Sequence, residues 1–174
     1  MSEHAAKLKK VRIFVTDVDG VLTDGRFILD YAGKELKMFH VHDGAAAKLA
    51  ASVGFQTVLV SGRRSEVVER RAKELGIRQV YQEADDKWKV VQEFMHKERI
   101  GADTICYIGD DLADLPVLRR VGFSVAVGNA VPEVKKAVDY VTERCGGDGA
   151  FREVVELVFK AQGRWKEIVE RYTT

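Results

Sequence analysis

Short apolar segments alternate with longer segments of helical periodicity along most of the chain. The short segments are rich in β-branched residues and predict strands at Val11–Thr16, Gln56–Val60, Gln79–Tyr81, Thr104–Ile108, Ser124–Val127 and Tyr140–Thr142. The longer segments predict helices at Asp43–Ser52, Ser65–Leu75, Asp86–Arg99, Leu115–Val121, Pro132–Val138, Phe151–Ala161 and Trp165–Tyr172. Strands that alternate with helices favour right-handed βαβ units. We therefore expect an α/β fold with a doubly wound, Rossmann-like parallel sheet that is covered on both faces.

One segment, Arg26–Val41, breaks this alternation. It contains two strand-like runs on either side of Tyr31-Ala32-Gly33-Lys34, which predicts a β-hairpin inserted after the first strand. No repeat, low-complexity tract or Pro- and Ser-rich linker interrupts the chain. A length of 174 residues is usual for one domain, so we expect a single domain over residues 1–174 that carries the hairpin 26–41.

The overall composition narrows the class of partner. The chain has 28 Lys and Arg against 27 Asp and Glu, a net charge of +1, which does not favour a nucleic-acid binder. Its apolar runs are too short to cross a bilayer, and the first ten residues do not resemble a signal peptide. The two cysteines, Cys106 and Cys145, suggest neither a disulfide framework nor a metal site. We expect a cytoplasmic protein with no nucleic-acid or membrane partner.

The segment DVDGVLTDG, residues 17–25, follows the first predicted strand directly. Ligands of doubly wound sheets bind at the carboxyl ends of the strands, so Asp17 and Asp19 lie where a ligand is expected. A solvated acidic loop that caps a helix is the alternative. Crowded carboxylates beside an apolar strand favour a cation or a catalytic role instead.

A second acidic segment, YIGDD at residues 107–111, follows another apolar strand. Carboxylates at two strand ends can form a site for Mg²⁺, which prefers a few carboxylates together with water and phosphate oxygens. Asp110 and Asp111 are the better candidates for this site. Asp114 lies just before Leu115-Pro116, and we expect it to cap the helix that starts there.

Two further residues, Ser61 and Lys87, are candidates for binding an anionic group. Ser61 follows the second predicted strand, where a hydroxyl and backbone N–H groups can bind an anion, although Ser-Gly is also an ordinary turn. Lys87 lies where a helix begins, which is unfavourable for the helix dipole and suggests another role than that of a surface lysine. Together the residues predict Asp17 as a nucleophile toward phosphorus, Asp19 as an acid or base and Asp110 as a metal anchor. Ser61 and Lys87 would bind phosphoryl oxygens, and Mg²⁺ with Lys87 would supply the positive charge that an anionic substrate needs.

In this order, the four motifs resemble those of the haloacid dehalogenase superfamily of phosphotransferases. The resemblance runs from Val11 to about Gly163. More narrowly, the chain resembles the family of 3-deoxy-D-manno-octulosonate 8-phosphate phosphatases, which act in the synthesis of lipopolysaccharide precursors. This narrower resemblance rests on DVDGVLTDG, GKELKMFHVHDG, SGR, YIGDDLADLPV and GGDGAFREV.

The resemblance implies a Mg²⁺-dependent hydrolysis of a sugar-acid phosphate through an aspartyl phosphate on Asp17. Asp19 would protonate the leaving oxygen and then activate water. The metal would be held by the carboxylates of Asp17 and Asp110 and by the backbone carbonyl of Asp19. Arg63 and Arg71 are eight positions apart near one predicted helix, so they can meet one anion; the alternative for Arg71 is a solvated helix residue. The substrate contacts implied by the family fall on Asp19, His40, Val41, His42, Asp43, Gly44, Lys48, Arg63, Arg71 and Lys87.

Two positions depart from the family pattern. His42 and Lys48 stand where relatives commonly have arginine, and neither side chain can bind a carboxylate in the bidentate manner of arginine. A phosphatase for a nine-carbon keto-deoxy sugar acid is therefore the nearest alternative. A receiver domain, which is a phospho-aspartate switch module, shares a parallel sheet, clustered Asp, Ser/Thr, Lys and Mg²⁺. The early Asp-x-Asp-Gly and the late Gly-Asp-Asp fit a phosphatase better, and a non-catalytic relative is disfavoured because no motif residue is lost.

The hairpin points to an oligomer. It carries more apolar residues than an isolated two-stranded ribbon tolerates in water, and the spacing of the motifs leaves no room for a cap domain that would cover the site. The resembling family forms tetramers in which such hairpins build a central barrel. We therefore expect a homotetramer whose neighbours complete each site, the alternative being a hairpin that folds back on its own sheet. The apolar residues in question are Phe27, Leu29, Leu36, Met38 and Phe39.

Overall fold

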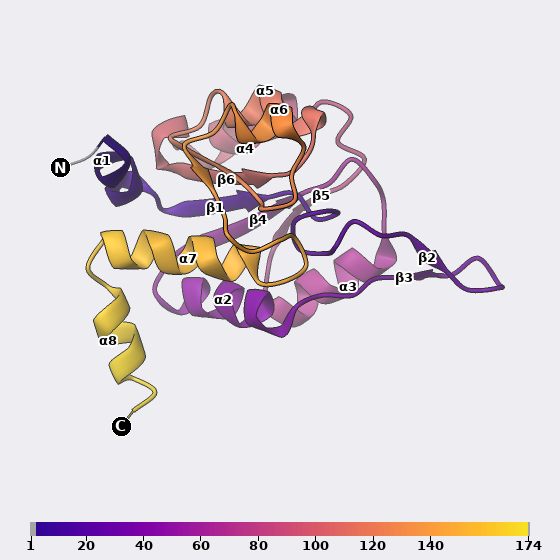
Figure 1. Cartoon of the computed structure of the whole chain (residues 1–174), viewed down its shortest axis with the longest axis horizontal. Coiled ribbons are helices and arrows are strands. Elements are labelled where there is room, and N and C mark those ends of the chain that lie inside the picture. Colours follow the sequence, from indigo (N-terminus) through magenta and orange to yellow (C-terminus); the bar gives the residue numbers. More distant parts are fainter. Residues whose placement is uncertain (1–2, 174) are drawn as a thin grey trace.

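The computed structural model describes residues 3–173 and is built around a six-stranded sheet (Figure 1). The strand order is β5-β4-β1-β6-β7-β8, and all neighbouring pairs are parallel. This confirms the doubly wound α/β fold that the alternation of elements predicts. The strands are β1 (Ile13–Thr16), β4 (Gln56–Val60), β5 (Gln79–Tyr81), β6 (Ile105–Gly109), β7 (Phe123–Ala126) and β8 (Tyr140–Val141).

Strand β1 is the point at which the direction of winding reverses. The chain passes from β1 outward to β4 and β5, and then returns to the other side of β1 to form β6, β7 and β8. Thr16, the last residue of β1, lies opposite Leu59 in β4 and Ile108 in β6. The carboxyl ends of these three strands therefore meet at a topological switch point, where open α/β sheets bind their ligands.

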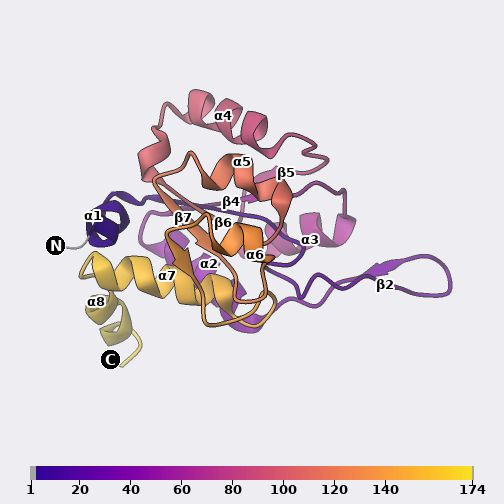
Figure 2. The same cartoon turned by 45° about the horizontal axis from the view of Figure 1, so that its top comes forward.

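Helices cover both faces of the sheet (Figures 1 and 2). One layer contains α2 (Val41–Ser52), α3 (Glu66–Leu75) and α7 (Ala150–Ala161), and the other contains α4 (Lys87–Glu98), α5 (Leu115–Leu118) and α6 (Pro132–Lys135). Two 3-10 turns, η1 (Ala102–Thr104) and η2 (Leu112–Asp114), flank β6, and α8 (Trp165–Glu170) continues the chain beyond α7. Among the described residues, no helix combines the length and apolar character needed to cross a membrane.

The core lies where β1 meets α2 and α7. Phe14 in β1 is fully buried, and its ring lies 5.6 Å from that of Phe55 and 5.8 Å from that of Phe151. Phe159, which lies further along α7 than Phe151, packs edge to face on Phe55, with 5.0 Å between the ring centres. These aromatic contacts join the sheet to the α2–α7 layer and hold β1 rigidly below the site.

The segment Arg26–Val41 forms the predicted hairpin. Its strands, β2 (Ile28–Leu29) and β3 (Glu35–Leu36), pair antiparallel in a separate two-stranded sheet. The ribbon projects from the body of the protein rather than folding back on the main sheet (Figures 1 and 2). It exposes large apolar side chains, among them Leu29 at 59%, Leu36 at 54% and Met38 at 69%.

Three helical segments differ from the prediction. Helix α1 (Glu3–Lys10) was not predicted, because its few apolar positions are stabilised by packing on α7 and β7 rather than by a repeat of their own. Helices α5 and α6 end three residues earlier than expected. Hydrogen bonds of the 3-10 type tighten the chain just after each of these two helices. Examples are Arg120 N to Val117 O after α5 and Ala137 N to Val134 O after α6.

Candidate active site

The acidic and polar residues predicted for chemistry lie at adjoining strand ends. Asp17 follows β1, Ser61 follows β4 and Asp110 follows β6, and these three strands are neighbours in the sheet. The backbone N–H of Asp17 donates to the carbonyl of Ile108 at 3.0 Å, which extends the β1–β6 ladder into the site. Lys87 is the first residue of α4, as the sequence predicts.

Lys87 joins two carboxylates in the interior. Its Nζ lies 2.7 Å from Asp17 Oδ2 and 2.7 Å from Asp114 Oδ1, and the lysine side chain is only 6% exposed. Burial by itself would lower the pKa of Lys87, but Asp17 and Asp114 outweigh it and raise that pKa above its ordinary value. The site therefore contains a permanently charged ammonium group that is held between two acids.

Asp114 occupies the predicted N-cap position of α5, but the prediction that it caps this helix by a hydrogen bond is wrong. Its side chain makes no capping hydrogen bond to α5 and is fully buried. It accepts hydrogen bonds from the Tyr107 hydroxyl at 2.6 Å and from the backbone N–H of Asp110 at 3.0 Å. The signal that points to it is Tyr107 itself, because a tyrosine in the middle of a buried strand needs an acceptor for its hydroxyl.

Asp111 is also placed differently from the prediction. It is exposed and its carboxylate accepts from Leu112 N at 2.7 Å, which caps the short turn η2. The residues whose carboxylate oxygens converge within 4.8 Å of one another are Asp17, Asp110 and Asp114. Asp114 thus takes the place in the acidic cluster that the sequence assigned to Asp111.

The electrostatics of this cluster favour a cation. Burial, and next the charge of Asp114, raise the pKa of Asp17 to about 6. Burial, and next the charges of Asp17 and Asp114, raise the pKa of Asp110 to about 7. Asp110 Oδ1 is buried and has no hydrogen-bond partner. An unpartnered buried carboxylate oxygen beside two other acids is a suitable ligand for a hard divalent cation, so the residues present fit Mg²⁺.

Glycines hold the catalytic loop against this cluster. Gly20 has φ +91°, and a side chain there would place its Cβ 2.1 Å from Asp110 Oδ2. On the other side of the loop, a Cβ at Gly146 would lie 1.7 Å from the carbonyl oxygen of Gly20. A Cβ at Gly147 would lie 2.4 Å from Asp24 N. The sequence left the GGDGAFREV segment without a role; its first two glycines allow this loop to pack directly on residues 20–24.

Asp19 lies at the mouth of the site. Its side chain is 27% exposed and forms an ion pair with Lys37, which comes from the hairpin and is only 2% exposed. Lys37 Nζ also lies 3.2 Å from Glu35 Oε1. Lys37 is not predicted for the site from the sequence, because a lysine in the alternating pattern of a hairpin is typical of a solvated residue. Ser61, directly after β4, is buried, and its Oγ accepts from Arg63 N at 3.3 Å.

The predicted substrate-binding segment His40–Gly44 forms the start of α2. His40 caps this helix, since its Nδ1 accepts from His42 N at 3.2 Å, while Val41 and His42 are exposed. Asp43 is buried, and its Oδ1 accepts from the backbone N–H of Arg152 at 2.8 Å in the first turn of α7. Helix α7 has Gly149 as its own N-cap, so Asp43 supplies the acceptor that this glycine lacks.

Arg71 lies in a different environment from Arg63. Its guanidinium pairs with both carboxylate oxygens of Glu74 at 2.8 Å, whereas the Arg63 guanidinium lies 3.5 Å from the centre of the Phe27 ring. Within one chain the two guanidinium groups therefore have separate partners, and that both arginines meet one substrate anion stays a prediction. Lys48 is exposed on α2.

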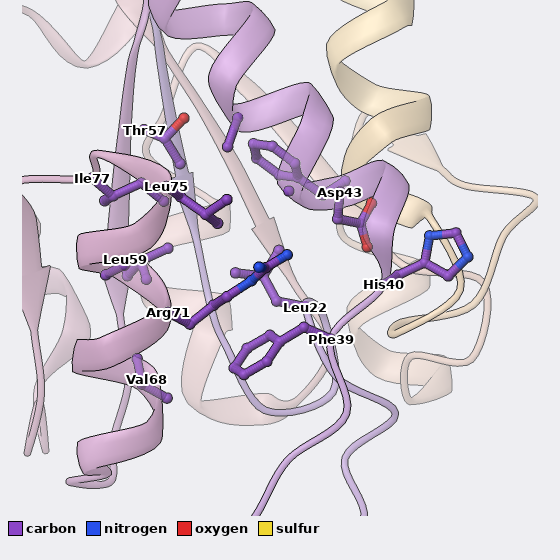
Figure 3. A pocket seen from close by; sticks show the side chains of 14 residues that line it. Leu22, Phe39, His40, Asp43, Thr57, Leu59, Val68, Arg71, Leu75 and Ile77 are labelled. Carbon is purple, nitrogen blue, oxygen red and sulfur yellow. The ribbon is translucent and has the colours of Figure 1, made fainter.

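Arg71, Asp43 and His40 line a small cavity between α2 and α3 (Figure 3). Its volume is about 20 Å³, and a Cβ at Gly44 would lie 2.4 Å from the Arg71 guanidinium. Asp43 Oδ2, Thr57 Oγ1 and Arg71 Nε are buried on its walls without a hydrogen-bond partner. The cavity is large enough for about one water molecule, which can bond to such atoms. It shares no lining residue with the acidic cluster, so the structure divides the predicted site residues into two groups.

Comparison with known proteins gives one consistent result. Residues 76–153 match the model of the haloacid dehalogenase-like hydrolases. The chain is 40% identical over 162 residues to the 3-deoxy-D-manno-octulosonate 8-phosphate phosphatase of Escherichia coli (strain K12), an alignment that covers 93% of this chain and 86% of that enzyme.

Solved structures agree with the sequence match. The phosphatase of the same name from Moraxella catarrhalis, in complex with a magnesium ion, a phosphate ion and a KDO molecule, superposes with a TM-score of 0.96 at 39% identity, covering 99% of each chain. The cobalt-bound form of the Haemophilus influenzae phosphatase superposes with a TM-score of 0.88 at 40% identity, covering 91% of this chain and 93% of that one.

Proposed function

The chain belongs to the haloacid dehalogenase-like hydrolases and, within them, to the 3-deoxy-D-manno-octulosonate 8-phosphate phosphatases, and we propose that it hydrolyses this sugar-acid phosphate with Mg²⁺. The observation that carries the proposal is the buried Asp17–Lys87–Asp114 group beside the unpartnered Asp110 oxygen. A chain that matches phosphatases over nearly its whole length is an enzyme, which decides against the receiver-module alternative.

The magnesium ion would be held by the carboxylates of Asp17 and Asp110 and by the backbone carbonyl of Asp19. When bound, it neutralises part of the negative charge that three acids would otherwise present to a phosphate. Gly20 supports this assignment, because it allows the loop that contains Asp19 to pack directly on Asp110.

Asp17 acts as the nucleophile. Its Oδ1 accepts from Val18 N at 2.6 Å and its Oδ2 accepts from Lys87, so the carboxylate is fixed before substrate arrives. One carboxylate oxygen attacks phosphorus and forms an aspartyl phosphate while the bond from phosphorus to the sugar oxygen breaks. Asp19 donates a proton to that leaving oxygen and later accepts one from a water molecule. This water attacks phosphorus, which releases inorganic phosphate and restores the Asp17 carboxylate.

The remaining site residues bind the phosphoryl group or position a catalytic side chain. Ser61 Oγ and the backbone N–H groups that follow it would bind phosphoryl oxygens, together with the Lys87 ammonium. Asp114 acts through Lys87: it is itself fully buried, accepts from Tyr107 and fixes the lysine beside Asp17. Asp114 is therefore a positioning residue in this mechanism.

A phosphate-release assay with Mg²⁺ tests the proposal. The substrates are the eight-carbon sugar-acid phosphate, a nine-carbon keto-deoxy sugar-acid phosphate and 4-nitrophenyl phosphate. We expect the highest kcat/KM for the eight-carbon substrate. A preference for the nine-carbon substrate would move the assignment to the alternative that His42 and Lys48 left open, and no release from any ester would overturn the phosphatase assignment.

We further propose that the enzyme is a homotetramer in which neighbouring hairpins pack together. The support is the ribbon that projects from the body and exposes Leu29, Leu36 and Met38. Large apolar side chains exposed side by side on a two-stranded ribbon are stabilised by burial against a partner. A role in lipopolysaccharide precursor synthesis follows from the proposed substrate, and placement in the cytoplasm stays a prediction.

A further inference from the structure

The hairpin contributes a buried charge to the catalytic site of its own chain. Lys37 lies directly after β3, and its side chain is 2% exposed although its neighbours Leu36 and Met38 are exposed. It pairs with Oδ1 of Asp19 and lies 3.2 Å from Oε1 of Glu35. Burial of a lysine is costly unless its charge is compensated, and here two carboxylates compensate it.

A network anchors this lysine to the body of the protein. Glu35 Oε2 accepts from Ser65 Oγ at 2.5 Å, and Ser65 is the N-cap of α3. Glu35 Oε1 also lies 3.7 Å from the guanidinium of Arg63, which stacks on Phe27 at the base of the hairpin. Burial by itself would raise the pKa of Glu35, but the Ser65 hydrogen bond and Lys37 outweigh it and lower that pKa. Lys37 is therefore held between Asp19 on one side and an anchored Glu35 on the other.

Two side-chain contacts of Asp19 involve the same carboxylate oxygen. Lys37 and, at 3.5 Å, the Thr23 hydroxyl both contact Oδ1, and Oδ2 takes part in neither contact. A carboxylate that is held by one oxygen cannot rotate freely, which leaves the other oxygen in a defined direction. This arrangement resembles the way in which metal-site and catalytic groups are oriented by a partner behind them.

We propose that Lys37 is a positioning residue for the acid–base step: its ammonium holds Asp19 Oδ1 so that Oδ2 is presented to the leaving oxygen of the substrate. This inference rests on the proposed phosphatase function and deepens it. It makes the hairpin part of the catalytic unit, because a displacement of β3 would move Lys37 and release Asp19. Glu35 and Ser65 serve the same purpose one step further away.

The test compares Lys37→Met with Lys34→Met, an exposed lysine at the turn of the same hairpin. Each variant is assayed on the sugar-acid phosphate and on 4-nitrophenyl phosphate, whose leaving group needs little protonation. General acid–base catalysis contributes about 10²–10⁴ in rate, so loss of its positioning should lower kcat on the sugar phosphate by about 10–100-fold with KM changed less than about threefold. On 4-nitrophenyl phosphate the loss should be under about threefold. Lys37→Arg should recover most of the rate, and Lys34→Met should behave as wild type.

A double-mutant cycle separates positioning from substrate binding. If Lys37 acts through Asp19, Lys37→Met should cost less than about twofold in an Asp19→Asn background. The proposal would be overturned if the rate losses of Lys37→Met and Asp19→Asn simply multiplied in the double variant. It would also be overturned if Lys37→Met slowed both substrates equally, or raised KM with kcat unchanged. If Lys37→Met does not fold by circular dichroism, Glu35→Gln replaces it and should show a smaller loss with the same leaving-group dependence; no such dependence would also overturn it. The wild-type rate on the eight-carbon substrate tests the proposed function separately, since Lys37 is judged by ratios to wild type on whichever sugar phosphate the enzyme hydrolyses.

Discussion

Asp114 Oδ1 lies 2.7 Å from the ammonium group of Lys87, and the two side chains are 0% and 6% exposed. The same ammonium lies 2.7 Å from Asp17, so a single lysine separates two buried acids that would otherwise repel each other. Its removal therefore affects both stability and catalysis, which a surface lysine would not do.

Lys87→Met should destabilise the fold as well as abolish activity. Breaking a buried ion pair by removing one partner typically costs about 3–5 kcal/mol, because the remaining charge is left buried and uncompensated. Urea unfolding at pH 7 measures this loss, with the exposed neighbour Lys89→Met as the matched control. The double variant Lys87→Met, Asp114→Asn should recover part of the stability and none of the activity. A Lys87→Met protein with wild-type stability and rate would restore the interpretation of Lys87 as a surface residue.

Removal of Asp110 should have opposite consequences with and without metal. Mg²⁺ at 100 times its Kd should stabilise the wild type by about 2.7 kcal/mol, seen as a rise in Tm. Asp110→Asn should lose this rise. In chelator the variant should be at least as stable as wild type, because it removes a carboxylate that burial and Asp17 disfavour. An unchanged Mg²⁺-dependent rise in Asp110→Asn would exclude Asp110 as a metal ligand.

The roles of Asp17 and Asp19 should be distinguishable by comparing esters whose leaving groups differ in their need for protonation. Asp17→Asn should abolish the covalent phosphoenzyme and activity on every ester, since a carboxamide is a poor nucleophile. Asp19→Asn should lose about 10²–10⁴ in rate on the sugar phosphate and much less on 4-nitrophenyl phosphate. Rapid-quench trapping of the phosphoenzyme, run beside steady-state rates, measures both effects. Equal slowing of the two esters by Asp19→Asn would contradict its acid role.

A charge on the hairpin should dissociate the proposed tetramer. Leu36→Asp places a carboxylate on a ribbon whose apolar residues need a partner. Light scattering after size exclusion should show a smaller species, with activity on the sugar-acid phosphate lost far more than activity on 4-nitrophenyl phosphate. Lys73→Asp, on the exposed face of α3, is the control and should remain a tetramer. A monomeric wild type with full activity on the sugar phosphate would exclude the proposed tetramer.

Asp139 should make stability depend on pH in the acid range. Burial by itself raises the pKa of Asp139, but hydrogen bonds from Lys7 and Ser124 outweigh it and lower that pKa below its ordinary value. A lowered pKa in the folded state means that the stabilisation is present above the unfolded value of about 3.9 and is lost as pH falls through the folded value. Lys7 Nζ lies 2.6 Å from Asp139 Oδ1, which anchors α1.

Asp139→Asn should therefore cost about 1.5–3 kcal/mol at pH 7, the usual range for hydrogen bonds to a charged group, and less at pH about 3, which is below the unfolded pKa. Urea unfolding at both values measures the difference. Asp103→Asn is the control, because the Lys10–Asp103 pair is longer, at 3.5 Å, and more than half exposed on both sides. A pH-independent loss in Asp139→Asn would show that the ionised form is not what α1 needs.

The order of the elements and the place of the chemistry could be predicted from local pattern. The β-branched run at β1 and the Gly-Asp-Asp after β6 are both readable in the chain, and parallel strands must bring their carboxyl ends to one edge. Asp17, Asp110, Ser61 and Lys87 were located in this way because each one adjoins the end of a strand or the start of a helix.

Which acid faces inward, and which distant group holds it, was decided only by tertiary packing. Asp111 and Asp114 differ by three positions in one short turn, and local pattern favoured the wrong one. The choice depends on Lys87 and Tyr107, which reach Asp114 from another helix and from the preceding strand. In the same way, Lys37 is part of the site because the returning strand of the hairpin places it beside Asp19, 18 positions earlier in the chain. Contacts of this kind depend on where whole elements lie in space, whereas periodicity and spacing report only on what each element is.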